Sequence, residues 1–201
     1  RIEAGTYAMA AAITNGDLTL DNCPMDALLS SVYTLEQAGV HVSTLAGVAS
    51  TGPSRQRTPA LAITSGSSDP SRATADDPMR RTVRITCDRI LRPVEVTTQP
   101  HPGFPTDLQA QLVSLLSLAD GNSVVTERIF PDRFLHVAEL LRMGAKITRQ
   151  GPSVIITGTR KLVGAPVMAS DLRASASLVL AGMAAHGTTV VFGDIPILYS
   201  P

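Results

Sequence analysis

The fold of this chain is decided by one stretch, Leu108-Gln109-Ala110-Gln111-Leu112-Val113-Ser114-Leu115-Leu116-Ser117-Leu118-Ala119-Asp120-Gly121-Asn122-Ser123-Val124-Val125-Thr126. Residues 108–120 are rich in leucine and alanine and contain no helix breaker, so they predict a helix. Gly121 is suited to ending that helix, and the β-branched residues after it predict a strand over Ser123–Thr126. The stretch is therefore one helix-to-strand unit.

The same order of helix, glycine and strand occurs twice more. The other two copies are Tyr7–Asn15, Gly16 and Leu18–Leu20, and Ser175–His186, Gly187 and Thr188–Val191. In the first two units a second helix ends at Gly39 or Gly144, 105 residues apart, the same spacing as that between Gly16 and Gly121. Repeated units of this kind pack helices against sheets, which predicts an α/β fold.

The first unit contains extra sequence. Gly121 and Gly187 are only 66 residues apart, so 39 residues are added in the first interval. Residues 46–84 match that length, and 18 of them are Gly, Pro, Ser or Thr. This composition predicts a disordered surface insertion. A basic docking arm is the functional alternative, and a segment that is absent from the mature protein is another.

Composition limits the class of protein. The 201 residues can bury one good core, which would be built from Ala, Val, Leu and Ile because only 3% of residues are aromatic. Seventeen basic and seventeen acidic residues cancel, so bulk attraction to nucleic acid or to an anionic membrane is not expected. No apolar run is long enough to predict a membrane span. Cys23 and Cys87 have no metal-ligand spacing and are predicted to be ordinary strand cysteines.

Several motifs carry a family resemblance. They are Arg1–Thr6, Leu91–Thr98 followed by the turn His101–Gln111, Phe130–Val137 and Ser170–Ala176. In this order they resemble the UDP-N-acetylglucosamine enolpyruvyl transferases, which are 1-carboxyvinyltransferases of the EPSP synthase superfamily. The resemblance covers residues 1–45 and 85–191 and matches only the later part of a family chain.

The resemblance implies a specific architecture. Such transferases have two domains, each built from three βαβαββ-type units with helices inside and sheets outside, an inside-out α/β barrel with substrate bound between domains. Residues 1–201 would be most of one domain, with the third unit truncated and residues 192–201 departing from the family pattern. The missing partner domain would carry the family's lysine–asparagine pair and its loop cysteine.

The resemblance also implies a reaction. The enolpyruvyl group of phosphoenolpyruvate would move to the 3-hydroxyl of UDP-N-acetylglucosamine, the first committed step of peptidoglycan synthesis, without a metal or dissociable cofactor. The location implied is the bacterial cytoplasm, with a plastid as alternative. Two other functions stay open: a 3-phosphoshikimate 1-carboxyvinyltransferase-like enzyme, and a non-catalytic binding protein derived from a transferase domain.

Asp107 is the first candidate site residue. By position alone, an aspartate at the start of a helix either caps the helix or is held ionised there and can accept a proton from an alcohol. The resemblance implies the second role, as the base that acts on the sugar hydroxyl, with Thr106 beside it. Asp171 matches a family aspartate close to the reacting enol carbon, and a helix cap is its alternative role.

Two arginines and a backbone position complete the candidate site. Planar guanidinium groups suit the carboxylate and phosphate of phosphoenolpyruvate, and the resemblance assigns this role to Arg133 and Arg173. Ile129 matches a position that contacts the nucleotide sugar through its backbone. Residues with weaker predictions are Arg1, Glu3 and Thr6 as a hinge, a sugar contact or plain packing, His101 as a turn residue near the sugar, and His136 as a helix histidine with its hydrogen bonds satisfied.

Overall fold

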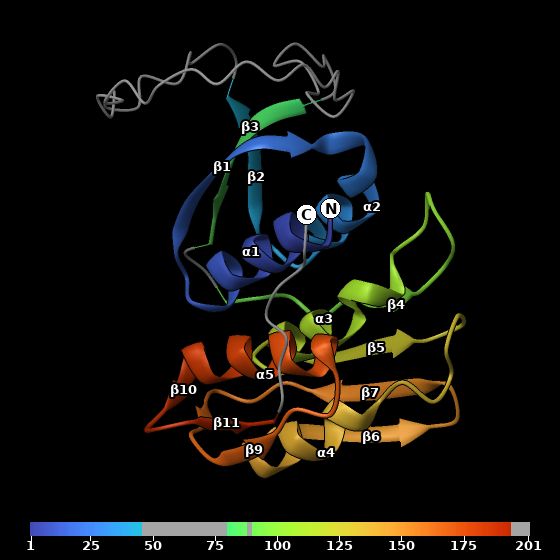
Figure 1. Cartoon of the computed structure of the whole chain (residues 1–201), viewed down its shortest axis with the longest axis vertical. Helices are drawn as coiled ribbons and strands as arrows, with labels where there is room; N and C mark the ends of the chain where they lie inside the picture. Colours follow the sequence, from blue (N-terminus) through green and yellow to red (C-terminus); the bar gives the residue numbers. More distant parts are fainter. Residues whose placement is uncertain (46–79, 88–89, 194–201) are drawn as a thin grey trace, which may run out of the picture.

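The computed structural model describes residues 1–45, 80–87 and 90–193 (Figure 1). The helices are α1 (Ile2–Ile13), α2 (Met25–Gln37), η1 (Thr106–Leu108), α3 (Gln109–Leu116), α4 (Leu135–Arg142) and α5 (Leu172–Ala184). The strands are β1 (Asp17–Pro24), β2 (His41–Leu45), β3 (Arg80–Thr86), β4 (Glu95–Thr97), β5 (Asn122–Thr126), β6 (Lys146–Gln150), β7 (Ser153–Thr157), β8 (Leu162–Val163), β9 (Pro166–Met168), β10 (Ala185–His186) and β11 (Val190–Phe192).

The first unit has a three-stranded sheet. Its strand order is β1-β3-β2, and β3 is antiparallel to both neighbours. Helix α1 leads into β1, and α2 connects β1 to β2. The register of β1 against β3 shifts between Leu20 and Cys23, which marks a bulge near the end of β1.

The second unit repeats this arrangement and adds one strand. Its sheet has the order β4-β5-β7-β6, in which β5-β7-β6 corresponds to β1-β3-β2. Strand β4 runs parallel to β5 and is joined to it through α3, which makes a βαβ unit. An offset of 105 residues carries β6 onto β2 at both ends, so the glycine spacing in the sequence reports a true structural repeat.

The third unit consists of short strands around α5. Strand β11 pairs in parallel with β9, and β10 pairs in parallel with β8. Helix α5 connects the two pairs in the right order for another βαβ connection.

Three helices, one from each unit, lie between the two main sheets (Figure 1). Their fully buried side chains include Met9 of α1, Leu112 of α3 and Leu178 of α5. Polar bonds also join them, because the Ser114 hydroxyl donates to the Ser177 carbonyl at 2.9 Å. One hydrophobic cluster thus runs through all three units and holds the loops between them in place.

The α/β fold with repeated units is confirmed, and some boundaries are corrected. The predicted insertion, 46–84, lies outside the described residues except for its last five, which belong to β3 and pair with β1 and β2. That end of the prediction is wrong because composition alone missed the alternating strand Arg80–Thr86. Of the predicted tail, Phe192 completes β11, and 194–201 lie outside the described residues. No helix of the described part is long and apolar enough to span a bilayer.

Candidate functional site

A tight turn after β4 presents Asp107. Thr98 and Phe104 form a β-bridge, and the Gln99 N–H donates to the Phe104 carbonyl at 3.0 Å. Pro105 then leads into η1, which contains Thr106 and Asp107 and runs directly into α3. Neither η1 nor α3 has a side-chain cap bond, so the cap alternative for Asp107 is wrong and its carboxylate is used elsewhere.

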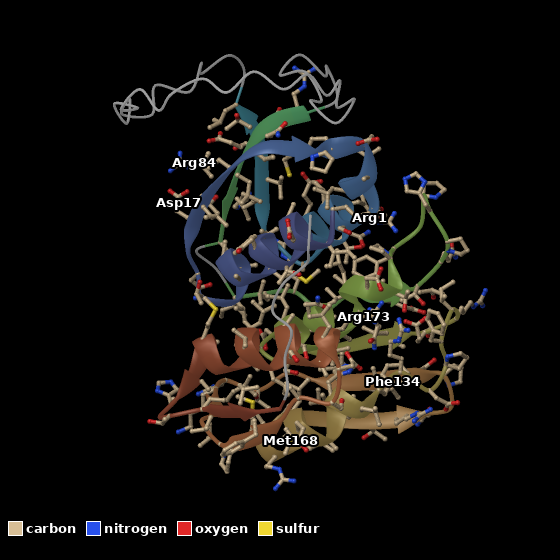
Figure 2. All side chains as sticks on the ribbon, viewed as in Figure 1. Arg1, Asp17, Arg84, Phe134, Met168 and Arg173 are labelled. Atoms are coloured by element: carbon tan, nitrogen blue, oxygen red, sulfur yellow. The ribbon has the colours of Figure 1, made fainter. Side chains whose placement is uncertain are left out.

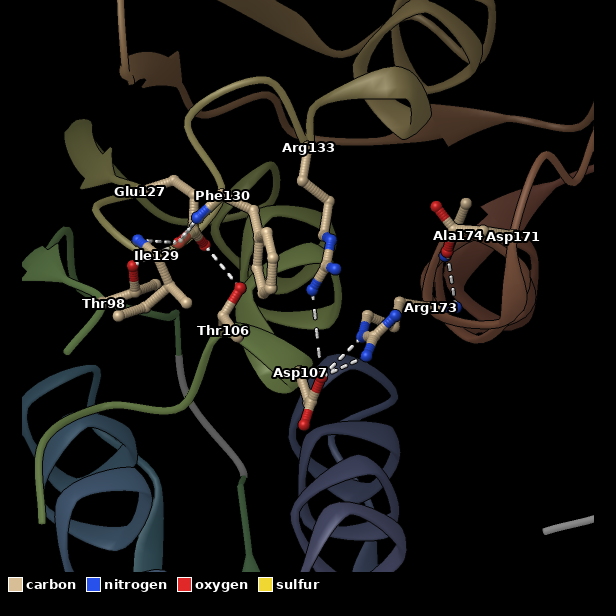
Figure 3. Close-up of polar contacts among 10 residues, drawn as sticks. All are labelled: Thr98, Thr106, Asp107, Glu127, Ile129, Phe130, Arg133, Asp171, Arg173 and Ala174. Carbon is tan, nitrogen blue, oxygen red and sulfur yellow. Dashed lines mark hydrogen bonds and ion pairs between the residues drawn. The ribbon is translucent and has the colours of Figure 1, made fainter. Parts of the chain in front are cut away.

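Asp107 is paired with two arginines from different units (Figure 3). The Arg173 Nε donates to Asp107 Oδ1 at 2.6 Å, and its Nη2 lies 2.5 Å from the same oxygen. Arg133 Nη1 lies 4.0 Å from Oδ1. Within the described residues these contacts use Oδ1 only, so Oδ2 is left for another donor. The three side chains are between one fifth and one third exposed, which makes the cluster accessible but only partly hydrated.

Arg133 is oriented by an aromatic ring. Its guanidinium carbon lies 3.8 Å from the centre of the Phe130 ring, a cation–π contact. Its Nη1 is buried and has no hydrogen-bond partner within the described residues. A partly exposed guanidinium with an unused N–H is suited to binding an anionic ligand group.

Asp171 is a helix cap. Its Oδ1 accepts hydrogen bonds from the N–H groups of Arg173 and Ala174 at 2.8 and 2.9 Å (Figure 3). The cap alternative is therefore confirmed, and proton transfer by Asp171 stays a prediction. The cap fixes the start of α5, and with it the backbone of Arg173.

A cavity of about 160 Å³ opens beside Asp107. It lies between the first and second units and is lined by Arg1, Ala27, Gln99, Pro100, His101, Gly103, Pro105, Thr106, Asp107 and Ile129. The lining combines polar side chains such as Thr106 and Asp107 with apolar ones such as Ala27, Pro105 and Ile129, and in pockets of this kind a few polar groups set the orientation of a small ligand. Four of the predicted residues, Arg1, His101, Thr106 and Ile129, thus meet Asp107 at one cavity.

Sequence reasoning missed Glu127 and Thr98. Glu127 is fully buried and accepts hydrogen bonds from Thr98 Oγ1 and Thr106 Oγ1 at 2.7 and 2.9 Å. It also accepts from the N–H groups of Ile129 and Phe130 at 2.8 and 3.0 Å. The sequence carries no signal for this role, because a glutamate that follows a strand is ordinarily an exposed loop residue.

Other predicted residues have mostly structural positions. Thr6 accepts a 3.3 Å hydrogen bond from Gln111 Nε2, which favours packing between α1 and α3, whereas Glu3 is exposed. His136 is buried in α4, but its Nε2 has no partner among the described residues, so the prediction of a satisfied histidine is wrong. Burial lowers the pKa of His136 from 6.5 to about 4, while the negative charge of Asp171 opposes the shift.

The two cysteines are buried. Cys23 lies in β1, as predicted, and Cys87 follows β3 by one residue. Neither lies at the cavity beside Asp107, so the structure gives them no place in the candidate site.

The cluster has the parts of a site for acid–base chemistry on an anionic substrate. Asp107 has an oxygen available to a hydroxyl, and two guanidinium groups lie on its other side. Guanidinium groups of this kind can also bind phosphate or carboxylate groups. The cavity would place a polar ligand next to the available oxygen.

Comparisons with known proteins identify the family of this chain. The family model for EPSP synthase (3-phosphoshikimate 1-carboxyvinyltransferase) matches residues 1–195. A UDP-N-acetylglucosamine 1-carboxyvinyltransferase of Nitratidesulfovibrio vulgaris (strain DP4) is 47% identical over 192 residues, which cover 95% of this chain and 38% of that protein. Its counterpart in Gluconacetobacter diazotrophicus is 48% identical over 191 residues, covering 95% of this chain and 37% of the relative. The chain therefore spans less than two fifths of the length of these relatives.

Solved structures support the fold. The enolpyruvyl transferase NikO from Streptomyces tendae superimposes with a TM-score of 0.69 at 23% identity, covering 94% of this chain and 38% of that one. An EPSP synthase from Acinetobacter baumannii gives a TM-score of 0.56 at 19% identity over 98% of this chain and 39% of that one. At these identities the likeness concerns the fold alone, and the fold is that of enolpyruvyl transferases.

Proposed function

This chain belongs to the EPSP synthase family, and we propose that it forms one half-site of a UDP-N-acetylglucosamine 1-carboxyvinyltransferase. The choice of sugar nucleotide is supported by curated relatives of that name, which are 42 to 48% identical to this chain. The observation that carries the proposal is the Asp107 carboxylate, bound to Arg173 through one oxygen and open to the cavity beside it.

The proposed reaction has two steps. In the first, the 3-hydroxyl oxygen of the sugar bonds to C2 of phosphoenolpyruvate while C3 gains a proton, and Asp107 takes the hydroxyl proton. In the second, C3 loses a proton and the bond from C2 to the phosphate oxygen breaks, which releases phosphate. Asp107 suits the first step because the contacts with the two arginines use its Oδ1, which leaves Oδ2 to accept the proton.

The arginines would bind the second substrate. Phosphoenolpyruvate carries a carboxylate and a phosphate, and Arg133 has a buried N–H without a hydrogen-bond partner in the described part of the chain. Arg173 would orient the Asp107 carboxylate through its hydrogen bond and approach the same anion from α5. Asp171 would keep Arg173 in place through its cap, and its second carboxylate oxygen, which the cap does not use, would be the candidate for the C3 proton transfer.

The remaining contacts would fix the sugar nucleotide. Thr106, Ile129, Arg1 and His101 all line the cavity. The second domain of the transferase would close the site and supply further groups for phosphoenolpyruvate. The complete protein would then act in peptidoglycan synthesis in the cytoplasm, and so in cell-wall biogenesis, cell shape and division.

A second candidate substrate comes from the family model, whose description names 3-phosphoshikimate. Both reactions share phosphoenolpyruvate and differ in the alcohol. A binding experiment with the two alcohols separates them directly, because only one should compete for the cavity beside Asp107.

The test is calorimetric titration of UDP-N-acetylglucosamine into the full 201-residue chain. We expect saturable binding that is at least about tenfold weaker in Asp107→Asn, because a charged hydrogen bond to the sugar hydroxyl is lost. Asp17→Asn is the matched control. Asp17 also pairs with an arginine, but it lies in the sheet of the first unit, far from Arg173 (Figure 2). Binding of shikimate 3-phosphate in place of the sugar nucleotide, or equal losses in both variants, would contradict the proposal.

A further inference from the structure

The buried carboxylate of Glu127 connects the two sides of the candidate site. It is fully buried, and four donors converge on its two oxygens. Oε1 accepts from Thr98 Oγ1 and from the N–H groups of Ile129 and Phe130, and Oε2 accepts from Thr106 Oγ1. Among the residues that the structure describes, Glu127 makes no ion pair, so hydrogen bonds alone stabilise this carboxylate.

The four donors belong to three separate segments. Thr98 follows β4, Thr106 begins η1, and Ile129 and Phe130 lie in the loop between β5 and α4. Thr98 also accepts a hydrogen bond from the Arg128 N–H at 2.9 Å, which ties the loop to the end of β4 a second time. A single side chain therefore fixes the relative position of the turn with Asp107 and the loop with Arg133.

Both branches lead to the same ion pair (Figure 3). On one branch, Glu127 holds Thr106, the residue next to Asp107. On the other, it holds the N–H of Phe130, whose ring lies against the Arg133 guanidinium at 3.8 Å. Asp107 and Arg133 then meet at 4.0 Å. A change at Glu127 must shift one partner relative to the other.

We propose that Glu127 is a positioning residue for this site: it sets the Asp107 carboxylate, the Arg133 guanidinium and the Ile129 backbone in one arrangement. The inference rests on the proposed function, since it names how that site is assembled. Glu127 acts through other residues because it is fully buried and does not line the cavity. It is therefore not a catalytic residue.

The shape of Glu127, more than its charge, is what the arrangement requires. Three of the four donors use Oε1, which a glutamine can present equally well. The fourth is the Thr106 hydroxyl, which can turn to accept from a glutamine N–H. Aspartate keeps the charge but is one methylene shorter, so it cannot reach both Thr106 and the loop. We expect glutamine to preserve the site and aspartate and alanine to disrupt it.

The experiment is nuclear magnetic resonance on the full chain, with Glu127→Gln, Glu127→Asp and Glu127→Ala. The amides of Ile129 and Phe130 should exchange with solvent at least about tenfold faster in the alanine and aspartate variants and within about threefold of wild type in the glutamine variant. The Arg173 Nε–H signal should shift in the same two variants. Glu127 has no hydrogen bond or ion pair with Arg173 in the described part of the chain, so we expect this shift to arise through Thr106 or Arg133, both of which act on Asp107.

Thr126→Val is the matched control. Thr126 directly precedes Glu127 in the chain. Its hydroxyl shares a 2.8 Å hydrogen bond with the Ser153 hydroxyl, away from the site. It should leave the Arg173 Nε–H signal unchanged. If the alanine variant does not fold, the aspartate and glutamine variants decide the question.

Two outcomes would overturn the inference. One is faster exchange at Ile129 and Phe130 with unchanged Arg173 and Asp107 signals, which would confine Glu127 to its own loop. The other is a normal site in Glu127→Asp and a disrupted one in Glu127→Gln, which would make charge the requirement. Titration of UDP-N-acetylglucosamine separates the proposed function: failure of the wild-type chain to bind it counts against that function, whereas the exchange and shift results still decide the role of Glu127.

Discussion

The first and second units share one scaffold but differ in one loop. Residues 22–29 and 127–134 correspond at the offset of 105 residues. In the first unit, β1 continues through a bulge to Pro24 and α2 begins at Met25. In the second unit, β5 ends at Thr126 and α4 begins only at Leu135. The same length of chain is strand and helix in one copy and a loop with Glu127, Ile129 and Arg133 in the other.

The difference has a local physical cause. The Glu127 side chain accepts hydrogen bonds from the N–H groups of Ile129 and Phe130, two and three residues later in the chain, as polar side chains do in turns and caps. These bonds hold the segment after Glu127 as a turn, and Pro131 disfavours helical backbone at Phe130, so α4 begins later than α2 does in its unit. Both units have the same arrangement of strands and helices, and a few polar residues form the candidate site in the second unit.

The largest expected effect tests the shared frame. Leu35 in α2 and Leu140 in α4 occupy corresponding positions, and both are at most 1% exposed in one hydrophobic cluster. We expect Leu35→Ala and Leu140→Ala each to lower the free energy of unfolding by about 2–5 kcal/mol, because each leaves a cavity. Urea unfolding followed by circular dichroism measures both.

Similar losses of unfolding free energy in the two variants, each with a single unfolding transition, would confirm that the two units fold together. Two separate unfolding transitions, or a Leu35→Ala variant as stable as the wild-type chain, would show that the first unit contributes little to the common core. Leu29→Ala is the control, because Leu29 lies on the exposed side of the same helix.

The second largest expected effect is a difference between the two units in how pH changes stability. His136 corresponds to Ser31, and both are buried polar residues without a partner for one atom in the described part of the chain. The folded pKa of His136 is lowered to about 4 by burial, with Asp171 opposing the shift. The unfolded chain therefore binds more protons between pH 4 and 6.5, and stability falls as pH decreases through that window.

The expected loss from pH 6.5 to pH 4 is at most about 3 kcal/mol. His136→Ser, which installs the residue of the first unit, should remove this part of the pH dependence and leave the part due to carboxyl groups. Unfolding free energies at several pH values between 4 and 7.5 give the difference between the two proteins. Parallel curves would mean that His136 does not titrate in this window.

The third effect compares two arginine–aspartate pairs. Arg173 and Asp107 are about one third and one fifth exposed, whereas both side chains of the Arg84–Asp17 pair are 52% exposed (Figure 2). The hydrogen bond from Arg84 lowers the pKa of Asp17, but solvent screens such a pair. Arg173→Ala should cost about 1–2 kcal/mol of stability, because a charged hydrogen bond in a partly buried cluster is lost.

Arg84→Ala should change the unfolding free energy much less and only at low salt. Measurements at low and at high salt distinguish the two variants. Equal losses that disappear together in high salt would contradict the view that the Asp107 cluster is shielded from solvent.

The sequence predicted the frame better than the site. The glycine spacing and the helix patterns located α1, α3, α5 and the repeat, because these follow from local periodicity. Motif resemblance identified Asp107, Arg133 and Arg173, and the structure brings these three together. It did not identify Glu127, because the role of that residue depends on Thr98 and Thr106, which lie more than twenty residues earlier in the chain, as well as on its own loop. The end of the insertion was misplaced because β3 gains its place only by pairing with β1 and β2.

The smallest expected effect concerns one glycine in each unit, and we expect the two substitutions to reduce stability equally. Gly39 and Gly144 end α2 and α4 with φ of +92° and +87°, a conformation that costs an L-residue about 1 kcal/mol. A Cβ at Gly39 would lie 3.9 Å from Arg92 Cγ, and one at Gly144 would meet nothing within 4 Å, so neither position adds a steric clash. Gly39→Ala and Gly144→Ala should therefore lower the urea midpoint equally. A larger loss at Gly144 would mean that the α4 end is held more tightly than the α2 end, and that the loop with Glu127 stiffens the whole second unit and not the site alone.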